Sequence, residues 1–528
     1  MVSLMNTISL ALFLSLAPSI CAADFHVDVQ SGSDATGDGS SQSPWKTITY
    51  AVSQLGSGTN RILVHPGRYD GSTGETFPIV LRAGMTLEST GIADDTIVYG
   101  DAVHDVFRIE GADADCSVIG LTIQNGQSGA SIFIDRAFAR ILNSTISGNQ
   151  IAGIRLGLGR TDQRVEISGN KIVENGAGVL DAADAYSVAL NSSDNEIRNN
   201  VGDGFYFVQN VRLASTRDAL QGNGGWGLKQ KIDLGGSLRT TISNATISGN
   251  QAGGIYTMAD QFCIYIPYVG YFCDDPTSFV QAIACTVYGN GGDGALKVGT
   301  SGAAAGFLSN SISWGNAGID NVNFKDVRCD IGTGSRIDAY SFSAPPLLVD
   351  PQSGDLRLRK DSPCVDQSPN LAFTDFEGEL GGVDGNSDGT AAGDIGADEF
   401  HPFVAPGTRA VVGQPFWFFS EAPPADDGQL VFVMISTADG EGSGGIPVPG
   451  SQGQTVDLAP DWLFQLGLTV QPALTGTLQN GFAQTATLTL PNSTQFLGPV
   501  YYAGATIDLA AGQFKYIMPT HQFSIATQ

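Results

Sequence analysis

The sequence predicts an all-β protein built mainly as a solenoid of stacked coils of short strands. Two observations predict this class. The 528-residue chain contains 68 glycines and only 15% charged residues, a composition typical of many turns and few exposed helices. Its middle part, residues 143–319, repeats a template in which an apolar residue is followed by Asn, then Gly and another apolar residue. A chain of this length is also expected to form two or more domains.

The repeated asparagines lie mostly 24 to 27 residues apart, with one step of 40 residues. They are Asn149, Asn175, Asn199, Asn223, Asn250, Asn290 and Asn316. A period in this range, with β-branched segments between Asn/Gly corners, predicts coils that stack to share one core. We expect the asparagines to form a hydrogen-bonded ladder between neighbouring corners. The long step predicts an insertion.

Segments on both sides of the repeats resemble known sequences. FHVDVQSGSDATGDGSSQSPWKTITYAVSQL (25–55) and ILVHPGRYDGSTGETFPIVL (62–81) are similar to the N-terminal portion of a bacterial family of unknown function that opens β-helices. LRLRKDSPCVDQSPN (356–370) and DIGADEF (394–400) are similar to segments that close them. Over residues 24–400 the chain therefore resembles the right-handed parallel β-helix proteins of the pectate-lyase-like type. That fold hosts lyases, hydrolases, epimerases, adhesins and binding proteins, so the resemblance implies architecture and leaves activity open.

The remaining segments complete the predicted organisation. Residues 1–23 contain an apolar run and a small-residue cleavage site typical of a secretory signal peptide, so we expect a secreted, periplasmic or cell-surface protein. TITYAVSQL (47–55) has helix-like spacing and is expected to cap the open end of the solenoid. Residues 403–528 lack the repeat corner and alternate apolar residues, which predicts a β-sandwich for carbohydrate contact, attachment or partner binding.

Charge and cysteine content narrow the partners. A formal net charge of −27 argues against nonspecific attraction to nucleic acid or to an anionic membrane surface. No stretch reaches the roughly 20 apolar residues that a membrane helix needs. Six cysteines follow the predicted signal peptide, and Cys263 and Cys273 bracket a short segment, so we predict a disulfide between these two. The pairing of the other four stays open.

Strand alternation predicts one outward row of side chains beside the repeat corners. The residue after each corner glycine should face inward, and the next should point outward. The outward row contains Arg155, Leu180, Tyr206, Lys229 and Tyr256. Because neighbouring coils lie about 4.8 Å apart, Tyr206, Lys229 and Tyr256 should form one patch, with Lys231 beside it and Trp226 at its rim. Arg155 lies in the same row, and Asp203 and Asp293 hold corresponding corner positions that would add polar or metal contacts.

This patch suits a sugar that carries carboxylates, because aromatic faces stack on sugar rings and ammonium groups bind the anions. The resemblance to lyases of this fold implies a basic residue that removes the proton next to a uronate carboxylate, while calcium or another cation neutralises that carboxylate. Lys229 or Lys231 would be this base, and Tyr206 or Tyr256 the acid. The competing interpretation is that these are ordinary exposed sheet residues.

Asp181 and Asp184 form a carboxylate pair that would suit glycoside hydrolysis. Alternation, however, points Asp181 inward, which favours a turn or capping role.

Two further segments carry candidate sites. The insertion presents three tyrosines, which we expect to contact a sugar or to pack on the solenoid: Tyr265, Tyr268 and Tyr271. In DGNSDG, acidic and amide side chains at alternate positions form the first half of a calcium loop, although the expected bidentate glutamate is missing. The predicted calcium ligands are Asp384, Asn386, Asp388 and Asp394. The alternative interpretation of this segment is an acidic turn.

Two functions remain open from the sequence. One is a secreted β-helical protein that binds an acidic polysaccharide, with or without cleavage by β-elimination; for an enzyme, a polysaccharide lyase ranks ahead of a glycoside hydrolase. The other is a noncatalytic extracellular or cell-surface scaffold or adhesin.

Overall fold

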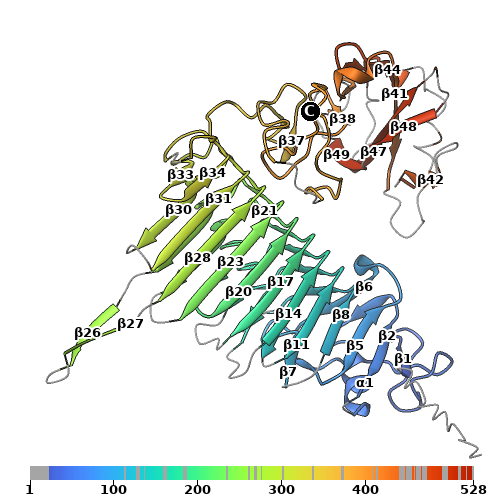
Figure 1. The fold of residues 1–528 in the computed structure, drawn as a ribbon. Coiled ribbons are helices and arrows are strands. Elements are labelled where there is room, and N and C mark those ends of the chain that lie inside the picture. The colour runs from blue at the N-terminus through green and yellow to red at the C-terminus, as the bar shows by residue number, and fades with distance from the viewer. Residues whose placement is uncertain are drawn as a thin grey trace, which may run out of the picture.

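The computed structural model describes residues 23–525 apart from short gaps. The main gaps in the first 400 residues are 112–114, 127–130, 158–162, 182–186, 233–235, 260–261, 267–269, 300–302 and 370–373, and further gaps lie between 408 and 519. Of the hairpin over 262–274 only the backbone is described. The described part is nearly all β and forms a parallel β-helix followed by small antiparallel sheets (Figure 1).

Each coil of the helix contributes one strand to each of three parallel sheets, which we number in the order in which the chain visits them. Sheet 1 contains β1 (Ala23–Val27), β2 (Asn60–Val64), β5 (Met85–Ser89), β8 (Asp115–Ile119), β11 (Phe138–Leu142), β14 (Gln163–Ser168), β17 (Val188–Ser193), β20 (Val211–Thr216), β23 (Ser237–Ser243), β28 (Thr277–Ile283), β31 (Ala304–Ser309) and β34 (Lys325–Val327). Sheet 2 contains β3 (Gly67–Tyr69), β6 (Thr96–Tyr99), β9 (Thr122–Gln124), β12 (Thr145–Ser147), β15 (Lys171–Val173), β18 (Glu196–Arg198), β21 (Ala219–Gln221), β24 (Thr246–Ser248), β29 (Thr286–Tyr288), β32 (Ile312–Trp314) and β35 (Asp330–Ile331). Sheet 3 contains β4 (Ile79–Leu81), β7 (Phe107–Glu110), β10 (Ile132–Asp135), β13 (Ile154–Leu156), β16 (Val179–Asp181), β19 (Phe205–Phe207), β22 (Trp226–Ile232), β25 (Gly253–Ala259), β30 (Asp293–Gly299) and β33 (Asn321–Val322).

The predicted inward positions form the core of the helix. The residues that follow the corner glycines are all fully buried: Ile154, Val179, Phe205, Leu228 and Ile255. They belong to one continuous apolar cluster that runs from Val27 to Ile331. Each coil is too thin to bury these side chains alone, so stacking supplies the apolar core.

The asparagine ladder is confirmed, with one correction. At each corner between sheets 2 and 3, an asparagine Oδ1 accepts hydrogen bonds from the backbone N–H and the Nδ2 of the asparagine one coil earlier. The member between Asn175 and Asn223 is Asn200, not Asn199 as the template predicted. Asn199 is exposed and has a positive φ of 56°, so it forms the bend while Asn200 enters the core. Two consecutive asparagines made the two roles indistinguishable in the sequence.

The N-terminal end is capped as predicted. Helix α1 (Ile48–Gln54) begins at the N-cap Thr47, whose side chain accepts the Tyr50 N–H, and it buries Ile48 and Ala51 on the solenoid core. The buried carboxylate of Glu75 accepts the first N–H groups of this helix, from Ile48 and Thr49. A short 3-10 helix, η1 (Ala93–Asp95), lies between β5 and β6.

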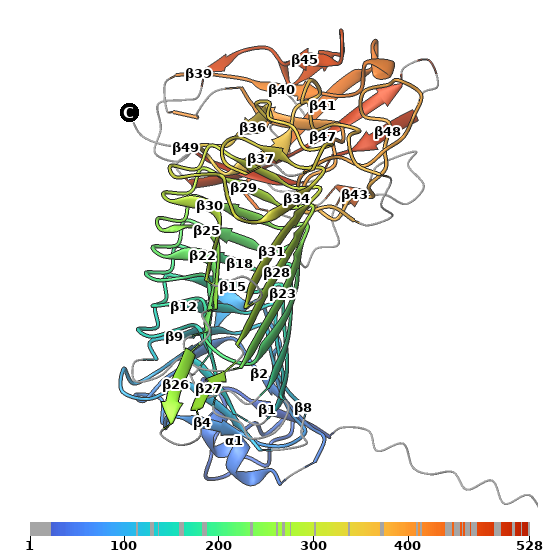
Figure 2. The ribbon, with the colours of Figure 1, turned by 60° about the vertical axis from the view of Figure 1, so that its left-hand side comes forward.

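The 40-residue step is an inserted β-hairpin, also as predicted. Strands β26 (Phe262–Ile266) and β27 (Gly270–Asp274) pair antiparallel between β25 and β28 and stand off from the body of the helix (Figures 1 and 2).

Residues 334–400 close the other end of the helix. The antiparallel pair β36 (Leu348–Asp350) and β37 (Asp355–Leu358) and the mostly irregular chain around it share a buried cluster with Ile312 of the last coils. The backbone N–H of Gly396 also donates to the carbonyl of Asn310. This agrees with the closing role predicted for DIGADEF.

The C-terminal region contains several antiparallel sheets. Its elements are β38 (Phe403–Pro406), β39 (Pro415–Phe416), β40 (Phe418–Glu421), η2 (Pro424–Asp426), β41 (Leu430–Ser436), β42 (Ile446–Pro447), β43 (Thr455–Val456), β44 (Thr475–Thr477), β45 (Phe482–Gln484), β46 (Leu488–Thr489), β47 (Gly498–Asp508), β48 (Gln513–Ile517) and β49 (His521–Ile525). Residues of the sheet β38-β40-β45 and of the sheet around β41 and β47 share one buried cluster, as expected for two layers of a sandwich.

Four cysteines in the described part are free and buried: Cys116, Cys285, Cys329 and Cys364. Burial raises the pKa of Cys285 and that of Cys329 to about 12, so these thiols stay protonated and behave as core side chains. Among the described helices, none has the length and hydropathy to cross a membrane.

Candidate functional site

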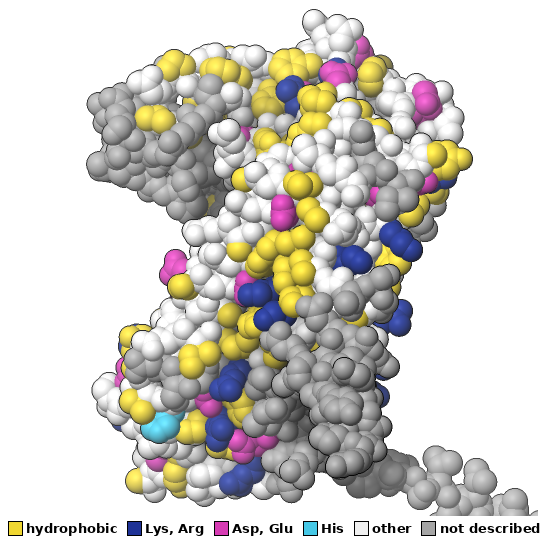
Figure 3. Space-filling model, turned by 90° about the vertical axis from the view of Figure 1, so that its left-hand side faces the viewer, with side chains coloured by type: hydrophobic (Ala, Val, Ile, Leu, Met, Phe, Trp, Pro, Cys, Tyr) yellow, Lys and Arg dark blue, Asp and Glu magenta, His cyan; other side chains and the backbone are white. Residues whose placement is uncertain are grey.

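The outward face of sheet 3 carries a continuous row of side chains, which we call the sheet 3 stripe. Its register, one residue per coil, is Arg108, Phe133, Arg155, Leu180, Tyr206, Lys229, Tyr256 and Leu296. Seven steps of about 4.8 Å make it roughly 34 Å long. Figure 3 looks onto this side of the helix, and hydrophobic side chains follow it as a band with Lys and Arg at intervals. The predicted row from Arg155 to Tyr256 is therefore confirmed.

Cations and aromatic rings alternate in the lower half of the stripe. Phe133 lies between two arginines in the register, with Arg108 on the preceding coil and Arg155 on the following one. The guanidinium carbon of Arg108 lies 5.0 Å from the centroid of the Phe133 ring, and that of Arg155 lies 5.6 Å from the same centroid. Arg108 also pairs with Asp105 and Glu110, both at 3.2 Å. Within the described residues, Arg155 has no carboxylate partner, so its charge is available to a ligand.

Lys229 is held between an acid and a ring. Its Nζ lies 3.4 Å from Oδ2 of Asp203 and 4.7 Å from the centroid of the Tyr206 ring. The side chains of Lys229 and Asp203 are 28% and 12% exposed, so the ammonium remains reachable while its partner is mostly covered. Both contacts are of the kind that an ammonium group makes.

Trp226 packs against Tyr256. Its ring lies 5.2 Å from the ring of Tyr256, measured between centroids. Trp226 pairs in register with Gly253, and a Cβ at Gly253 would lie 2.2 Å from Cζ3 of the indole. The missing side chain at Gly253 thus lets the indole lie flat over the next coil. Sequence analysis placed Trp226 at this rim but gave no reason for Gly253.

Other predicted contacts have structural partners. Oδ1 of Asp203 accepts the Trp226 N–H at 2.7 Å, and Oδ1 of Asp293 accepts the Ile319 N–H at 2.7 Å, so both acids brace the following corner. Lys231 pairs in register with Met258, two positions along the strands from the Lys229–Tyr256 pair. Arg155 lies two coils before Tyr206 and three before Lys229. It therefore lengthens the patch but is not adjacent to Lys229.

Sequence analysis missed the lower end of the stripe, Arg108 and Phe133. The signal was present in VFRIE (106–110) and SIFID (131–135), which have the same inward-outward-inward alternation. The coil of Arg108 has no corner asparagine, and in the coil of Phe133 the outward residue lies eight positions after Asn125 instead of five or six, so the template did not reach them.

Asp181 faces the core, as alternation predicted. It is 2% exposed, and its two oxygens accept the N–H groups of Val208 and Gln209, each at 2.9 Å. Burial raises the pKa of Asp181 to about 7 against the effect of these hydrogen bonds. Asp181 therefore anchors a loop of the following coil, and Asp184 lies outside the described residues.

The tyrosines of the insertion fall where side chains are not described. Tyr265 and Tyr271 are opposite each other in the β26–β27 register, and Tyr268 lies outside the described residues. The same register pairs Cys263 with Cys273. Directly opposed residues of an antiparallel pair have Cα separations that a disulfide spans, so the predicted bridge stays a prediction with compatible backbone pairing.

The predicted calcium loop closes on itself. Oδ1 and Oδ2 of Asp384 accept the N–H groups of Asp388 and Gly389, and Oδ1 of Asn386 also accepts the Asp388 N–H. Asp394 is buried, and its oxygens accept the N–H groups of Asp366 and Phe400, both at 2.6 Å. In the part of the chain that is described, no three His, Cys, Asp or Glu side chains are grouped to hold a metal. Calcium binding stays a prediction.

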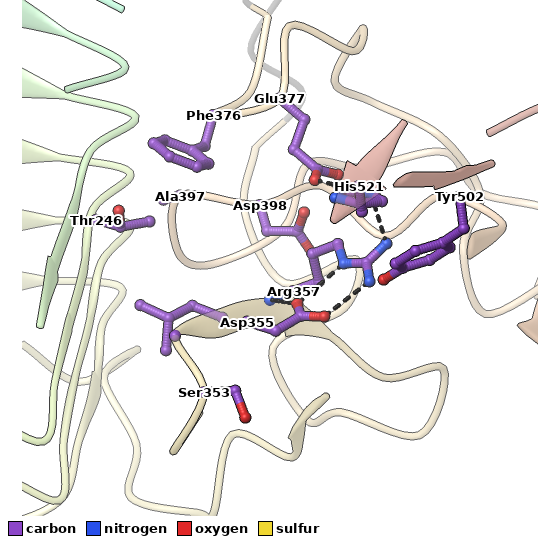
Figure 4. Close-up of a pocket in the computed structure, with 12 residues that line it drawn as sticks. Thr246, Ser353, Asp355, Arg357, Phe376, Glu377, Ala397, Asp398, Tyr502 and His521 are labelled. Carbon is purple, nitrogen blue, oxygen red and sulfur yellow. Dashed lines mark hydrogen bonds and ion pairs between the residues drawn. The ribbon is translucent and has the colours of Figure 1, made fainter. Parts of the chain in front are cut away.

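A separate cavity of about 270 Å³ lies where the closing segment meets the C-terminal region (Figure 4). Arg357 is buried there and donates to Asp355 at 2.7 and 2.9 Å and to Nε2 of His521 at 2.9 Å. Burial and the neighbouring Arg357 lower the pKa of His521 to about 3, whereas burial raises that of Glu377 to about 7. Because Asp355 already neutralises the Arg357 guanidinium, we infer that this cluster holds the closing segment and the C-terminal region together.

Part of the chain matches a known protein family. Residues 30–277 match a family model described as a protein of unknown function (DUF1565), which confirms the resemblance seen in the N-terminal segment. No curated protein matches the chain.

Two solved structures are similar to the chain. One is a point mutant of the periplasmic alginate epimerase AlgG, with 13% identity, a TM-score of 0.25 and coverage of 52% of this chain and 83% of the other. The other is the A-module of the mannuronan C-5 epimerase AlgE6 from Azotobacter vinelandii, with 13% identity, a TM-score of 0.23 and coverage of 56% and 93%. At these values neither structure carries an argument about activity. What the comparisons establish is that residues 30–277 of this β-helix are similar to a family whose function is not established.

Proposed function

We propose that the protein binds an acidic polysaccharide along the sheet 3 stripe. The observation that supports this most is a row in which three cations are interspersed with aromatic or apolar side chains over eight successive coils of one face. A straight row with a repeat of about 4.8 Å suits an extended polymer better than a compact ligand. Sugar rings stack on Tyr206, Trp226 and Tyr256, and carboxylates bind Arg155 and Lys229.

Cleavage by β-elimination is the second candidate. The adjacent Tyr206, Lys229 and Tyr256 bring hydroxyl groups and an amine to one point of the stripe. In that reaction Lys229 or Lys231 would take the proton beside the uronate carboxylate, and a tyrosine hydroxyl would protonate the leaving oxygen. Lys229 is already held by Asp203 and by the Tyr206 ring, in contacts that an ammonium group makes, so binding of a carboxylate is the better supported function.

The test measures binding and product in parallel. The purified secreted chain is titrated with alginate, polygalacturonate and uncharged dextran, with and without calcium, while unsaturated uronates are followed by ultraviolet absorbance. Lys229→Ala should weaken binding to an acidic polymer by about tenfold or more, as expected for a lost charge-assisted contact. Lys171→Ala removes an exposed lysine on sheet 2 and should leave affinity unchanged.

The outcomes separate the candidates. Binding without product supports a binding protein, and product that disappears in Lys229→Ala and Lys231→Ala supports a lyase. If no acidic polymer binds, or if Lys229→Ala binds as the unmodified chain does, the stripe is an ordinary sheet surface and the scaffold alternative stands.

A further inference from the structure

Sheet 1 carries a second outward row, on a different face of the helix from the sheet 3 stripe. In Figure 1 its strands cross the front of the helix. The row, which we call the arginine row, is Phe138, Arg164, Ala189, Arg212, Arg239 and Phe279 on six successive coils.

The three arginines of the row are all exposed. Within the described residues, none of Arg164, Arg212 and Arg239 makes an ion pair, although the chain as a whole has 53 acidic residues against 26 basic ones. The outer two lie against rings: the guanidinium carbon of Arg164 is 5.6 Å from the Phe138 centroid, and that of Arg239 is 5.2 Å from the Phe279 centroid.

The arginine spacing favours an anion between the side chains. Arg212 and Arg239 are directly opposite each other on neighbouring strands, about 4.8 Å apart along the row. Like charges in that position destabilise a sheet. An anionic group that bridges the two guanidiniums replaces this repulsion with charge-assisted hydrogen bonds, and the planar guanidinium matches carboxylate and sulfate geometry.

A hollow of about 330 Å³ lies beside the row. Its lining includes Phe138, Arg164 and Asn191, together with Arg140, which is paired to Asp115 at 3.3 Å and to Glu166 at 3.4 Å. The ring, the amide and the guanidinium of Arg164 together suit a hydroxyl-rich ring that carries an anionic group.

We propose that the arginine row is a second binding site for an anionic polysaccharide, separate from the sheet 3 stripe. A glycan with one carboxylate or sulfate per sugar matches three arginines spread over roughly 14 Å. Nucleic acid carries far denser charge and meets repulsion from a protein of net charge −27. At physiological salt the screening length is about 8 Å, so the local arginines decide the binding of a sparsely charged chain. The inference does not require the stripe to bind.

The experiment compares two double variants of the full secreted chain. Arg212→Ala with Arg239→Ala removes the central charges, and Arg212→Lys with Arg239→Lys keeps the charge but loses the planar donors. Affinity is measured for dextran sulfate, polygalacturonate, uncharged dextran and a single-stranded DNA oligonucleotide. Arg198→Ala, on sheet 2, is the matched control, because its Nε already pairs with Glu196 at 3.1 Å.

We expect the alanine double variant to bind at least one of the two acidic polymers about tenfold or more weakly, with the lysine variant in between and Arg198→Ala unchanged. The two polymers distinguish sulfate from carboxylate recognition. The same loss should appear in a Lys229→Ala background, since the two rows lie on different sheets. Unchanged binding of both polymers by the alanine variant would overturn the proposal. Arginine-dependent binding of DNA that is tighter than that of either polymer would also overturn it.

Discussion

The corrected asparagine ladder predicts that two adjacent asparagines differ sharply in their contribution to stability. Asn200 is 1% exposed, and its side chain makes four hydrogen bonds, to Asn175, Ile172 and Asn223. Asn200→Ala removes all four, which takes the acceptor from the N–H of Asn175 and one donor from the carbonyl of Ile172. At about 1 kcal/mol net for each hydrogen bond, the free energy of unfolding should fall by about 4 kcal/mol.

Asn199→Gly is the matched control. The equivalent position in five other coils is a glycine with φ between 62° and 68°: Gly148, Gly222, Gly249, Gly289 and Gly315. Glycine adopts this conformation without the strain of a Cβ, so Asn199→Gly should change stability by about 0.5 kcal/mol or less. Urea unfolding followed by circular dichroism measures both variants, and hydrogen exchange at the amide of Asn175 reports the lost contact directly. The reasoning fails if the two variants destabilise equally, or if the Asn175 amide stays protected in Asn200→Ala.

Three further predictions concern buried charges and calcium. Arg357→Ala leaves the partly buried Asp355 without its partner, so the thermal midpoint of the junction should fall by an amount equivalent to about 3 kcal/mol, whereas Arg198→Ala should have little effect. Burial raises the pKa of Asp181 to about 7, so the protonated carboxyl contributes to the free energy of unfolding. This contribution is fully present below about pH 4 and is lost as the pH rises through 7. Asp181→Asn should therefore reduce the difference between the urea midpoints at about pH 5 and pH 8, and an unchanged pH profile would contradict this. Isothermal titration of the full chain with calcium should give a site that disappears in Asp384→Asn, and identical heats for both proteins would rule out the loop.

The sequence predicted those features that follow from strand alternation and a visible corner. Ile154, Phe205 and Leu228 were placed inward, and Tyr206 and Lys229 outward, because each lies one or two residues from a corner glycine. The arginine row escaped prediction because the strands of sheet 1 are not preceded by such a corner, so their register with neighbouring coils was not set. The Arg357–His521 contact joins residues 164 positions apart and depends on how two regions dock, which no local pattern records.

The three sheets differ in the side chains at their outward positions, and this difference bears on whether the sheet 3 stripe and the arginine row arose by chance. Every outward position in a β-helix becomes a column of side chains, so a column of cations and rings arises only when successive coils repeat the same choice. On sheet 2 the corresponding column places Lys171 next to Glu196, and its later members Thr246 and Thr286 are buried. The Thr286 Oγ accepts the Ala397 N–H, so the closing segment covers this sheet at its C-terminal coils. Sheets 1 and 3 carry the basic and aromatic columns on exposed or half-exposed positions, whereas sheet 2, covered in its later coils by the closing segment, carries no such column among the coils described here. Both columns therefore lie at positions that solvent reaches, as a ligand-binding role requires.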